Sequence, residues 1–162
     1  MGNLVVTALR VVIVLGIVGS VFVQAVMGPL LAIDLEDAPA GVRWPVVVIL
    51  LLGVVVAQVV MVCVWRLLTL VRRGTVFSDA AFRYVDVVIG AVAVGAALFF
   101  ALGVVLAPGE AVAPGIVLLI GGAGGLVGGV ALLVLVLRAL LAQAVARDRE
   151  AHELQAELEQ VI

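Results

Sequence analysis

The sequence predicts an all-α integral membrane protein, a four-helix bundle with both termini in the cytoplasm and a fourth helix that extends into the cytosol. Of its 162 residues, 66% are hydrophobic and 12% are charged, whereas soluble domains are about 45–50% apolar. Four continuous apolar stretches each reach the roughly 20 residues that a helix needs to cross a hydrocarbon layer of about 30 Å. A soluble core of this size could not hide so much apolar surface, so lipid is the expected solvent.

The first predicted span runs from about residue 11 to 33 and ends at the acidic segment 34–37. Trp44 and Pro45 follow a short loop and open the second span, about residues 46–68. Tryptophan favours the membrane interface, and proline is tolerated in the first turn of a helix.

Trp65 and Arg66 mark the opposite membrane interface, and a polar connection follows them. Within that connection, Ser78 is the predicted N-cap of the next helix, and Asp79 is placed where a negative charge complements the helix dipole. The third predicted span runs from about residue 84 to 106.

Pro114 opens the fourth predicted span, about residues 114–141, and no helix-breaking residue separates this span from the polar sequence after it. We therefore predict one continuous helix with a membrane part and a cytosolic part. The chain divides into a four-helix membrane domain, residues 1–146, and a charged amphipathic cytosolic helix, residues 147–162. Apolar residues recur at helical spacing along this last helix, and three of them are candidate partner-binding residues: Leu154, Leu158 and Val161.

The placement of arginines predicts the orientation of the chain. Only Arg43 lies on one side of the spans, and the other eight lie on the opposite side: Arg10, Arg66, Arg72, Arg73, Arg83, Arg138, Arg147 and Arg149. The arginine-rich side is expected to be cytoplasmic, in a multi-pass protein of the bacterial cytoplasmic (inner) membrane. The connection on that side adds Arg72, Arg73 and Phe77 as candidate partner-binding residues.

The middle of the four spans lacks ionisable side chains, which argues against proton relays, ion pathways and catalysis within the bilayer. The one histidine, His152, lies in the tail and the one cysteine, Cys63, lies in a span, so no cluster has metal-ligand spacing. We expect no enzymatic activity, no metal and no cofactor. A net charge of −2 without a basic stripe excludes direct binding of nucleic acid.

Three polar side chains are candidate intramembrane sites: Gln24, Gln58 and Asp86. The two amides lie in mid-span, where a polar group must find a partner, so helix packing is favoured over a ligand role. Asp86 lies one turn after Arg83, and we expect these two side chains to form an ion pair. An unpaired Asp86 would be the leading protonation or ligand site.

Residues 121–129 are rich in glycine but are not a phosphate loop, because no Lys-Ser or Lys-Thr pair follows them. At helical spacing the glycines form two lines that allow close approach of another helix. One line holds Gly121, Gly125 and Gly129, and the other holds Gly124 and Gly128. Packing inside the monomer is favoured, and a homo-oligomer interface is the alternative.

The motif at residues 74–78, followed by a helix with Arg83 and Gly90, resembles a family of small bacterial four-span membrane proteins catalogued only as a domain of unknown function. The closing stretch, residues 157–162, is similar to that family's acidic and apolar ending. Asp86 departs from the basic or neutral residue expected there. Family members are often encoded beside a small helix-turn-helix regulator, so the resemblance implies such a regulator as a partner; it implies no catalytic residue, substrate or cofactor.

The favoured function is that of a non-enzymatic membrane protein that contacts a soluble partner, in interaction or signalling, through its cytosolic connection and C-terminal helix. Two alternatives stay open. One is a small multi-span transporter or efflux protein that acts as an oligomer, although a proton-coupled version would lack the expected mid-membrane carboxylate. The other is a structural subunit of a larger membrane complex.

Overall fold

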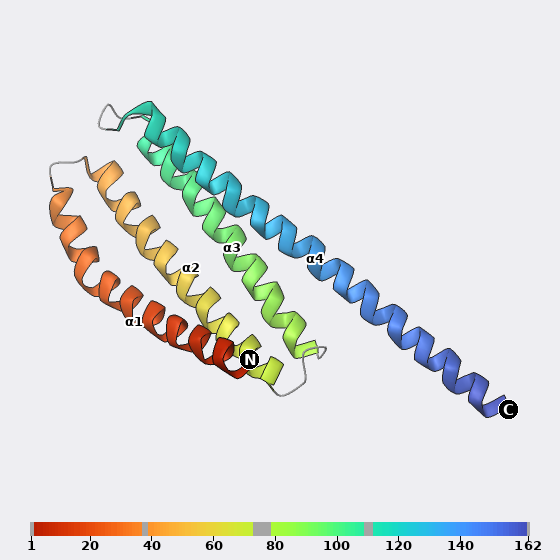
Figure 1. Ribbon diagram of the computed structural model, residues 1–162. Helices are drawn as coiled ribbons and strands as arrows, with labels where there is room; N and C mark the ends of the chain where they lie inside the picture. The colour runs from red at the N-terminus through yellow and green to blue at the C-terminus, as the bar shows by residue number, and fades with distance from the viewer. Residues whose placement is uncertain (1, 37–38, 73–78, 109–111, 162) are drawn as a thin grey trace.

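The computed structural model describes residues 2–36, 39–72, 79–108 and 112–161, and these residues form four α-helices (Figure 1). Each helix is long and apolar enough to cross a membrane. The predicted all-α, four-helix fold of a multi-pass membrane protein is thereby confirmed. The bounds of the helices are Gly2–Asp34 for α1, Ala40–Arg72 for α2, Asp79–Leu106 for α3 and Pro114–Val161 for α4.

Helix α1 begins earlier than the first predicted span. It starts at Gly2, so Arg10 lies inside the helix and inside the candidate span Leu4–Asp34. Its 33 residues extend about 50 Å, which exceeds a hydrocarbon core of about 30 Å. The ends of α1 therefore have room to lie in the interfaces, where the charge of Arg10 is tolerated. Pro29, which lacks an amide donor, interrupts the backbone ladder, and α1 follows a bowed course (Figure 1).

Helix α2 also begins before its predicted span. Proline was expected in the first turn, but the helix starts at Ala40 and Pro45 lies in the second turn. The first turn is closed instead by the carbonyl of Pro39, which accepts hydrogen bonds from the amides of Val42 and Arg43 at 2.8 and 3.0 Å. The helix start thus depends on a backbone acceptor that precedes Trp44, not on the Trp44-Pro45 pair.

Helix α3 begins at Asp79, and Ser78, its predicted N-cap, lies outside the described residues. Helix α4 begins at Pro114, the residue at which the sequence places a helix start. It continues unbroken past residue 141 to Val161, in agreement with the prediction of one helix. At about 1.5 Å per residue, its 48 residues extend roughly 70 Å.

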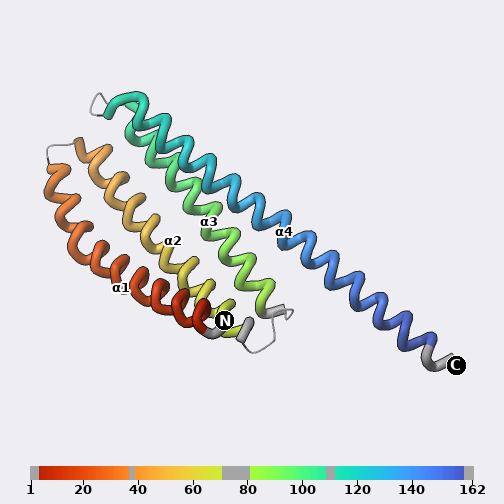
Figure 2. Tube along the Cα trace, viewed as in Figure 1, coloured from red at the N-terminus to blue at the C-terminus, as the bar shows by residue number. Residues whose placement is uncertain are grey.

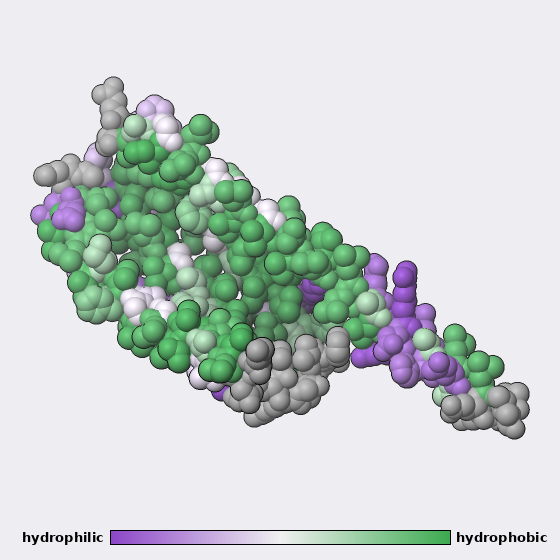
Figure 3. Space-filling view, in the orientation of Figure 1, coloured by the Kyte–Doolittle hydropathy of each residue, from purple (hydrophilic) through white to green (hydrophobic). Residues whose placement is uncertain are grey.

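The helices pack in the order of the chain. Contacts join α1 with α2, α2 with α3, and α3 with α4, and in the described part of the chain α1 contacts neither α3 nor α4. The result is a layer of antiparallel helices in which both faces of each helix are largely open. Few side chains are buried, and most valines, leucines and phenylalanines of the spans are exposed, so the visible surface is almost continuously apolar (Figure 3). Such a surface fits contact with lipid.

The C-terminal part of α4 leaves this layer and continues alone (Figure 2). Its surface changes from apolar to hydrophilic where it leaves the other helices (Figure 3). The described side chains of residues 147–158 are all exposed. We call residues 147–161 the projecting segment; at its base, Arg149 still lines a groove together with Arg83 of α3.

Candidate functional site

A cluster of polar side chains joins α1 to α2 within the spans. The side-chain amide of Gln58 on α2 donates to the hydroxyl of Ser20 and to Oε1 of Gln24, both on α1, at 3.0 Å each. Ser20 in turn donates to the carbonyl of Ile17 at 2.8 Å. The structure thus brings together two of the sequence's candidates and adds Ser20, which sequence reasoning missed.

This amide cluster contains no titratable group, so it offers hydrogen bonds and no proton transfer. Both amide protons of Gln58 are used in these contacts, and all three side chains are partly buried. In lipid, an amide without partners would cost several kcal/mol, whereas a paired one stabilises helix association by about 0.6 kcal/mol on average. The cluster therefore stabilises the packing of α1 against α2.

Asp86 of α3 forms a two-pronged ion pair with Arg138 of α4. Nη2 of Arg138 donates to Oδ2 of Asp86 at 2.6 Å, and Nε of Arg138 lies 2.5 Å from Oδ1 as an ion-pair contact that is not aligned as a hydrogen bond. The Arg138 guanidinium also lies over the ring of Phe82, 5.8 Å from its centroid. Both side chains are partly exposed, at 31% for Arg138 and 48% for Asp86.

The predicted partner of Asp86 was wrong: the ion pair is made with Arg138, not with Arg83. The antiparallel arrangement of α3 and α4 places the two residues side by side, since Asp86 lies 20 residues before the end of α3 and Arg138 lies 24 residues after the start of α4. The planar fork of the Arg138 guanidinium matches the two oxygens of the carboxylate.

Arg10 of α1 lies against Trp65 of α2 at the same end of the layer. Its guanidinium is 5.2 Å from the centroid of the indole ring, a distance suited to a cation–π interaction. Nη2 of Arg10 makes a long hydrogen bond of 3.4 Å to the hydroxyl of Thr69, and that hydroxyl donates to the carbonyl of Trp65 at 3.0 Å. The sequence placed Trp65 at the interface but gave no indication of this contact with Arg10.

The two glycine lines of α4 have different surroundings. A Cβ on Gly124 would lie 2.9 Å from Cβ of Phe99 and 3.4 Å from the carbonyl oxygen of Ala96, and one on Gly128 would lie 3.6 Å from Cβ of Ala96. This line therefore packs closely against α3. In the other line, no neighbouring heavy atom of the described residues lies within 4 Å of the Cβ position; its members are Gly121, Gly125 and Gly129.

Two grooves flank α3. One, of about 540 Å³, is lined by apolar residues of α2 and α3 together with Ser20, Val23 and Val127, so all four helices contribute to it. No charged side chain lines this groove, and its chemistry suits hydrocarbon chains. The other, of about 400 Å³, surrounds the Asp86–Arg138 pair and includes Arg83 and Arg149.

The candidate partner-binding residues are placed as follows. Leu154 and Leu158 lie on the projecting segment and are 61% and 64% exposed. Arg73 and Phe77 lie outside the described residues, and only the backbones of Arg72 and Val161 are described, as parts of α2 and α4.

The described residues contain no group of three histidine, cysteine, aspartate or glutamate side chains that could hold a metal ion. Cys63 is buried in α2 as a free thiol. The arrangement of the described side chains offers hydrogen bonding, ion pairing and apolar contact.

The model of the family described as "Protein of unknown function (DUF2975)" matches residues 30–162. This range starts near the end of α1 and includes α2, α3 and α4. No curated protein and no solved structure matches the chain.

Proposed function

Because the chain belongs to the family described as "Protein of unknown function (DUF2975)", which brings no activity with it, we propose a function from the chain's own geometry. The protein is a membrane-anchored docking protein that binds a soluble protein through the projecting segment, residues 147–161. The family resemblance predicted from residues 74–78 is confirmed, and the helix-turn-helix regulator it suggests is the first partner to test.

One observation carries this proposal: two leucines stand exposed on a helix that has left the membrane layer. Leu154 and Leu158 are separated by one turn and share a face, with exposures of 61% and 64%. The segment continues α4 without a break, so its helix is already formed, and its exposed apolar stripe favours a covering partner. A groove on a soluble protein can receive such a stripe.

The charges beside the stripe indicate the chemistry of the partner. The projecting segment carries more acidic than basic side chains, and the acidic ones dominate toward its C-terminus: Glu150, Glu153, Glu157 and Glu159. The matching surface is an apolar groove with a basic rim. Charge complementarity of this kind raises the rate of association and selects against acidic surfaces.

The proposal is tested by retention of a soluble partner on the purified membrane protein. The intact chain, a chain ending at residue 146, and the Leu158→Glu variant are purified in mild detergent, and bound proteins or added regulator are quantified. Leu158→Glu is expected to reduce binding by about tenfold or more, because an apolar anchor is replaced by a charge. The matched control is Ala156→Glu, which adds the same charge on the opposite face of the helix and should retain the partner.

Two results would overturn the proposal. One is a partner retained equally by all four proteins. The other is loss of a dimer, detected by light scattering, in Leu158→Glu without any soluble protein bound to the intact chain; the segment would then join two copies of this chain. The transporter alternative gains no support from the polar candidates, because Gln24 pairs with Gln58 and Asp86 pairs with Arg138.

A further inference from the structure

Among the arginines whose side chains are described, four lie at one end of the helix layer and differ in their partners: Arg10, Arg66, Arg83 and Arg138. We refer to this end as the arginine-rich end. Arg138 is neutralised by Asp86. Among the described residues, no carboxylate lies within ion-pair distance of Arg10 or Arg66. Arg10 belongs to α1 and Arg66 to α2. The positive charge on these two helices therefore lacks a protein counterion in the described structure.

Arg10 is also short of hydrogen-bond acceptors. Its Nε is buried and has no acceptor, and its Nη2 reaches only the Thr69 hydroxyl, at 3.4 Å. A guanidinium carries five N–H donors, and leaving them unsatisfied away from water costs free energy. The ring of Trp65 stabilises the cation from one side but accepts none of these donors in a conventional hydrogen bond. An anionic oxygen would satisfy these donors.

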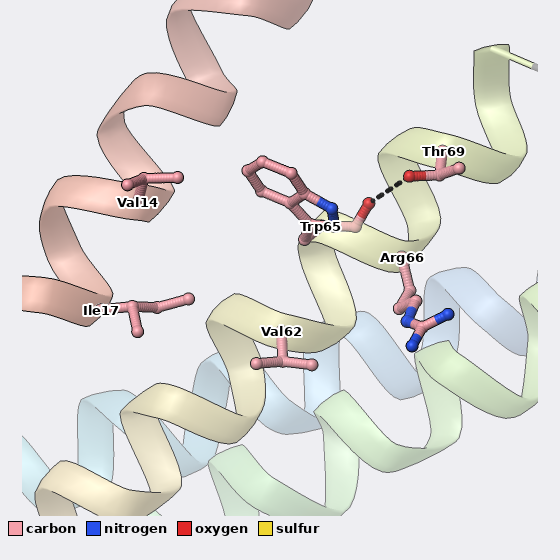
Figure 4. A pocket seen from close by; sticks show the side chains of 6 residues that line it. All are labelled: Val14, Ile17, Val62, Trp65, Arg66 and Thr69. Atoms are coloured by element: carbon pink, nitrogen blue, oxygen red, sulfur yellow. Dashed lines mark hydrogen bonds between the residues drawn. The ribbon is translucent and has the colours of Figure 1, made fainter.

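A groove leads from this end along α1 and α2. It has a volume of about 490 Å³ and is lined by six side chains: Val14, Ile17, Val62, Trp65, Arg66 and Thr69. Trp65 points toward α1, and Arg66 extends from the same part of α2 in the direction away from α1 (Figure 4). A second groove, of about 270 Å³, includes Arg10 and shares Val14 and Trp65 with the first.

The groove changes from cationic to apolar along the helix axis. Arg66 and Thr69 lie near the end of the candidate span Ala40–Leu70, and Val62 lies one turn deeper. On α1, Arg10 is followed one and two turns deeper by Val14 and Ile17. The sequence of chemical groups matches a phospholipid, which has an anionic phosphate at the bilayer surface and acyl chains below it.

We propose that these two adjoining grooves bind an anionic phospholipid, with its phosphate held by Arg10 and an acyl chain along Val14, Ile17 and Val62, while Arg66 adds positive charge beside the headgroup. Arginine forms paired hydrogen bonds with phosphate oxygens, which satisfies the donors that the protein leaves free. A free phosphate would use the cationic end alone and leave the apolar part of the groove without a ligand. The lipid accounts for both parts.

The test uses the fluorescence of Trp65, which lines both grooves. In a Trp44→Phe background Trp65 is the one remaining tryptophan, and its quenching by lipids with brominated acyl chains reports which lipid is adjacent. Vesicles contain phosphatidylcholine mixed with phosphatidylglycerol, with one or the other brominated. Each arginine near an anionic lipid surface contributes about a fivefold preference, so Arg10→Gln is expected to reduce the preference for phosphatidylglycerol about fivefold. Arg66→Gln should reduce it to a similar extent, and Arg10→Lys should retain most of it.

Arg43 supplies a matched control at the opposite end of α2. It also lies against a tryptophan, Trp44, at 5.6 Å, and its Nε also lacks an acceptor, but it lines neither groove. Arg43→Gln should leave the quenching of Trp65 unchanged. The proposal is overturned if phosphatidylglycerol and phosphatidylcholine quench Trp65 equally, if Arg43→Gln acts like Arg10→Gln, or if soluble glycerol phosphate displaces the brominated lipid. Elution volume in detergent checks that each variant is folded.

Discussion

Gly124 and Gly125 are neighbours in the sequence with opposite surroundings. The Cβ of Gly124→Ala would meet Cβ of Phe99 at 2.9 Å, which forces α3 and α4 apart, whereas Gly125→Ala adds a methyl group in open space. We expect Gly124→Ala to lower the free energy of unfolding by about 1–3 kcal/mol. Gly125→Ala should be neutral or slightly stabilising, because alanine favours the helix.

Titration from a mild detergent into sodium dodecyl sulfate measures the free energy of unfolding of both glycine variants. Equal destabilisation by the two would contradict the packing of Gly124 against α3. If Gly125→Ala instead left unfolding unchanged but lowered the molecular mass of the particle, the line of Gly121, Gly125 and Gly129 would be a contact between copies of the chain.

Asp86 and Arg138 provide a second test at the scale of single residues. Because the pair is partly exposed at the end of the spans, we expect a coupling free energy of about 1 kcal/mol, near the upper part of the range for surface pairs. A double-mutant cycle with Asp86→Asn and Arg138→Gln measures it through the same unfolding assay. Arg83→Gln serves as the control, and a coupling between Asp86 and Arg83 larger than that with Arg138 would refute the observed pairing.

At the residue scale, the sequence predicts which side chains need partners better than it predicts the partners. Gln24, Gln58 and Asp86 were all identified as polar groups in apolar stretches, which is a local property of the sequence. Their contacts with Ser20 and Arg138 depend on the register between helices, and hydropathy carries no information on register. Trp65 was placed at the interface from its residue type, but its contact with Arg10 again required the neighbouring helix.

At the scale of elements, α1 depends on one neighbour. It contacts α2 and no other helix in the described part of the chain, and the amide cluster joins the two helices by side-chain hydrogen bonds in mid-span, in addition to the contact of Arg10 with Thr69. Gln58→Leu should lower the free energy of unfolding by about 1 kcal/mol, because it leaves Gln24 without its donor. The double variant Gln24→Leu with Gln58→Leu should recover most of that loss, since replacing both partners by apolar groups is nearly neutral.

The same detergent titration distinguishes these amide variants. A double variant that loses as much as the sum of the two single variants would show that the amides act independently and that the hydrogen bond contributes little. Exposed Val55→Ala on α2 provides a control for a general effect of substitution in that helix.

The sequence predicts a helix boundary more reliably where a residue such as proline marks it than where only hydropathy does. Pro114 begins α4 because a proline suits a first turn and nothing upstream continues the helix. In contrast, α1 begins at Gly2 and α2 at Ala40, several residues before the apolar stretches start. Hydropathy reports the part of a helix that lies in lipid, whereas the backbone continues its hydrogen bonds through the interface.

At the scale of the whole molecule, the distribution of arginines predicts that both termini are cytoplasmic. A fluorescent-protein fusion after residue 162 should therefore fluoresce, and an alkaline phosphatase fusion in the connection after Asp34 should be active outside the cytoplasm. Fusions at residues 75 and 110 provide the matched pair, with the first expected inside and the second outside. Phosphatase activity of a fusion after residue 162 would show that the orientation is opposite to the predicted one. The projecting segment would then lie outside the cytoplasm, where no cytosolic partner could reach it.

The fold of the whole molecule could be predicted from the sequence because four apolar stretches of sufficient length leave few alternatives. The open packing could not, because a closed bundle and a layer in which each helix contacts only its chain neighbours expose similar compositions to lipid. The observed layer follows from contacts such as those of Gly124 with Phe99 and Gln58 with Gln24, each of which joins consecutive helices.

Helix α4 runs without interruption from Pro114 to Val161, and it therefore behaves mechanically as a lever with its fulcrum at the membrane boundary. The 15 residues beyond residue 146 extend about 22 Å, so a tilt of about 10° in the membrane part displaces the far end by about 4 Å. A change in bilayer thickness alters the tilt of a spanning helix. Any protein held at Leu154 and Leu158 would be moved by such a change without a rearrangement of the other three helices.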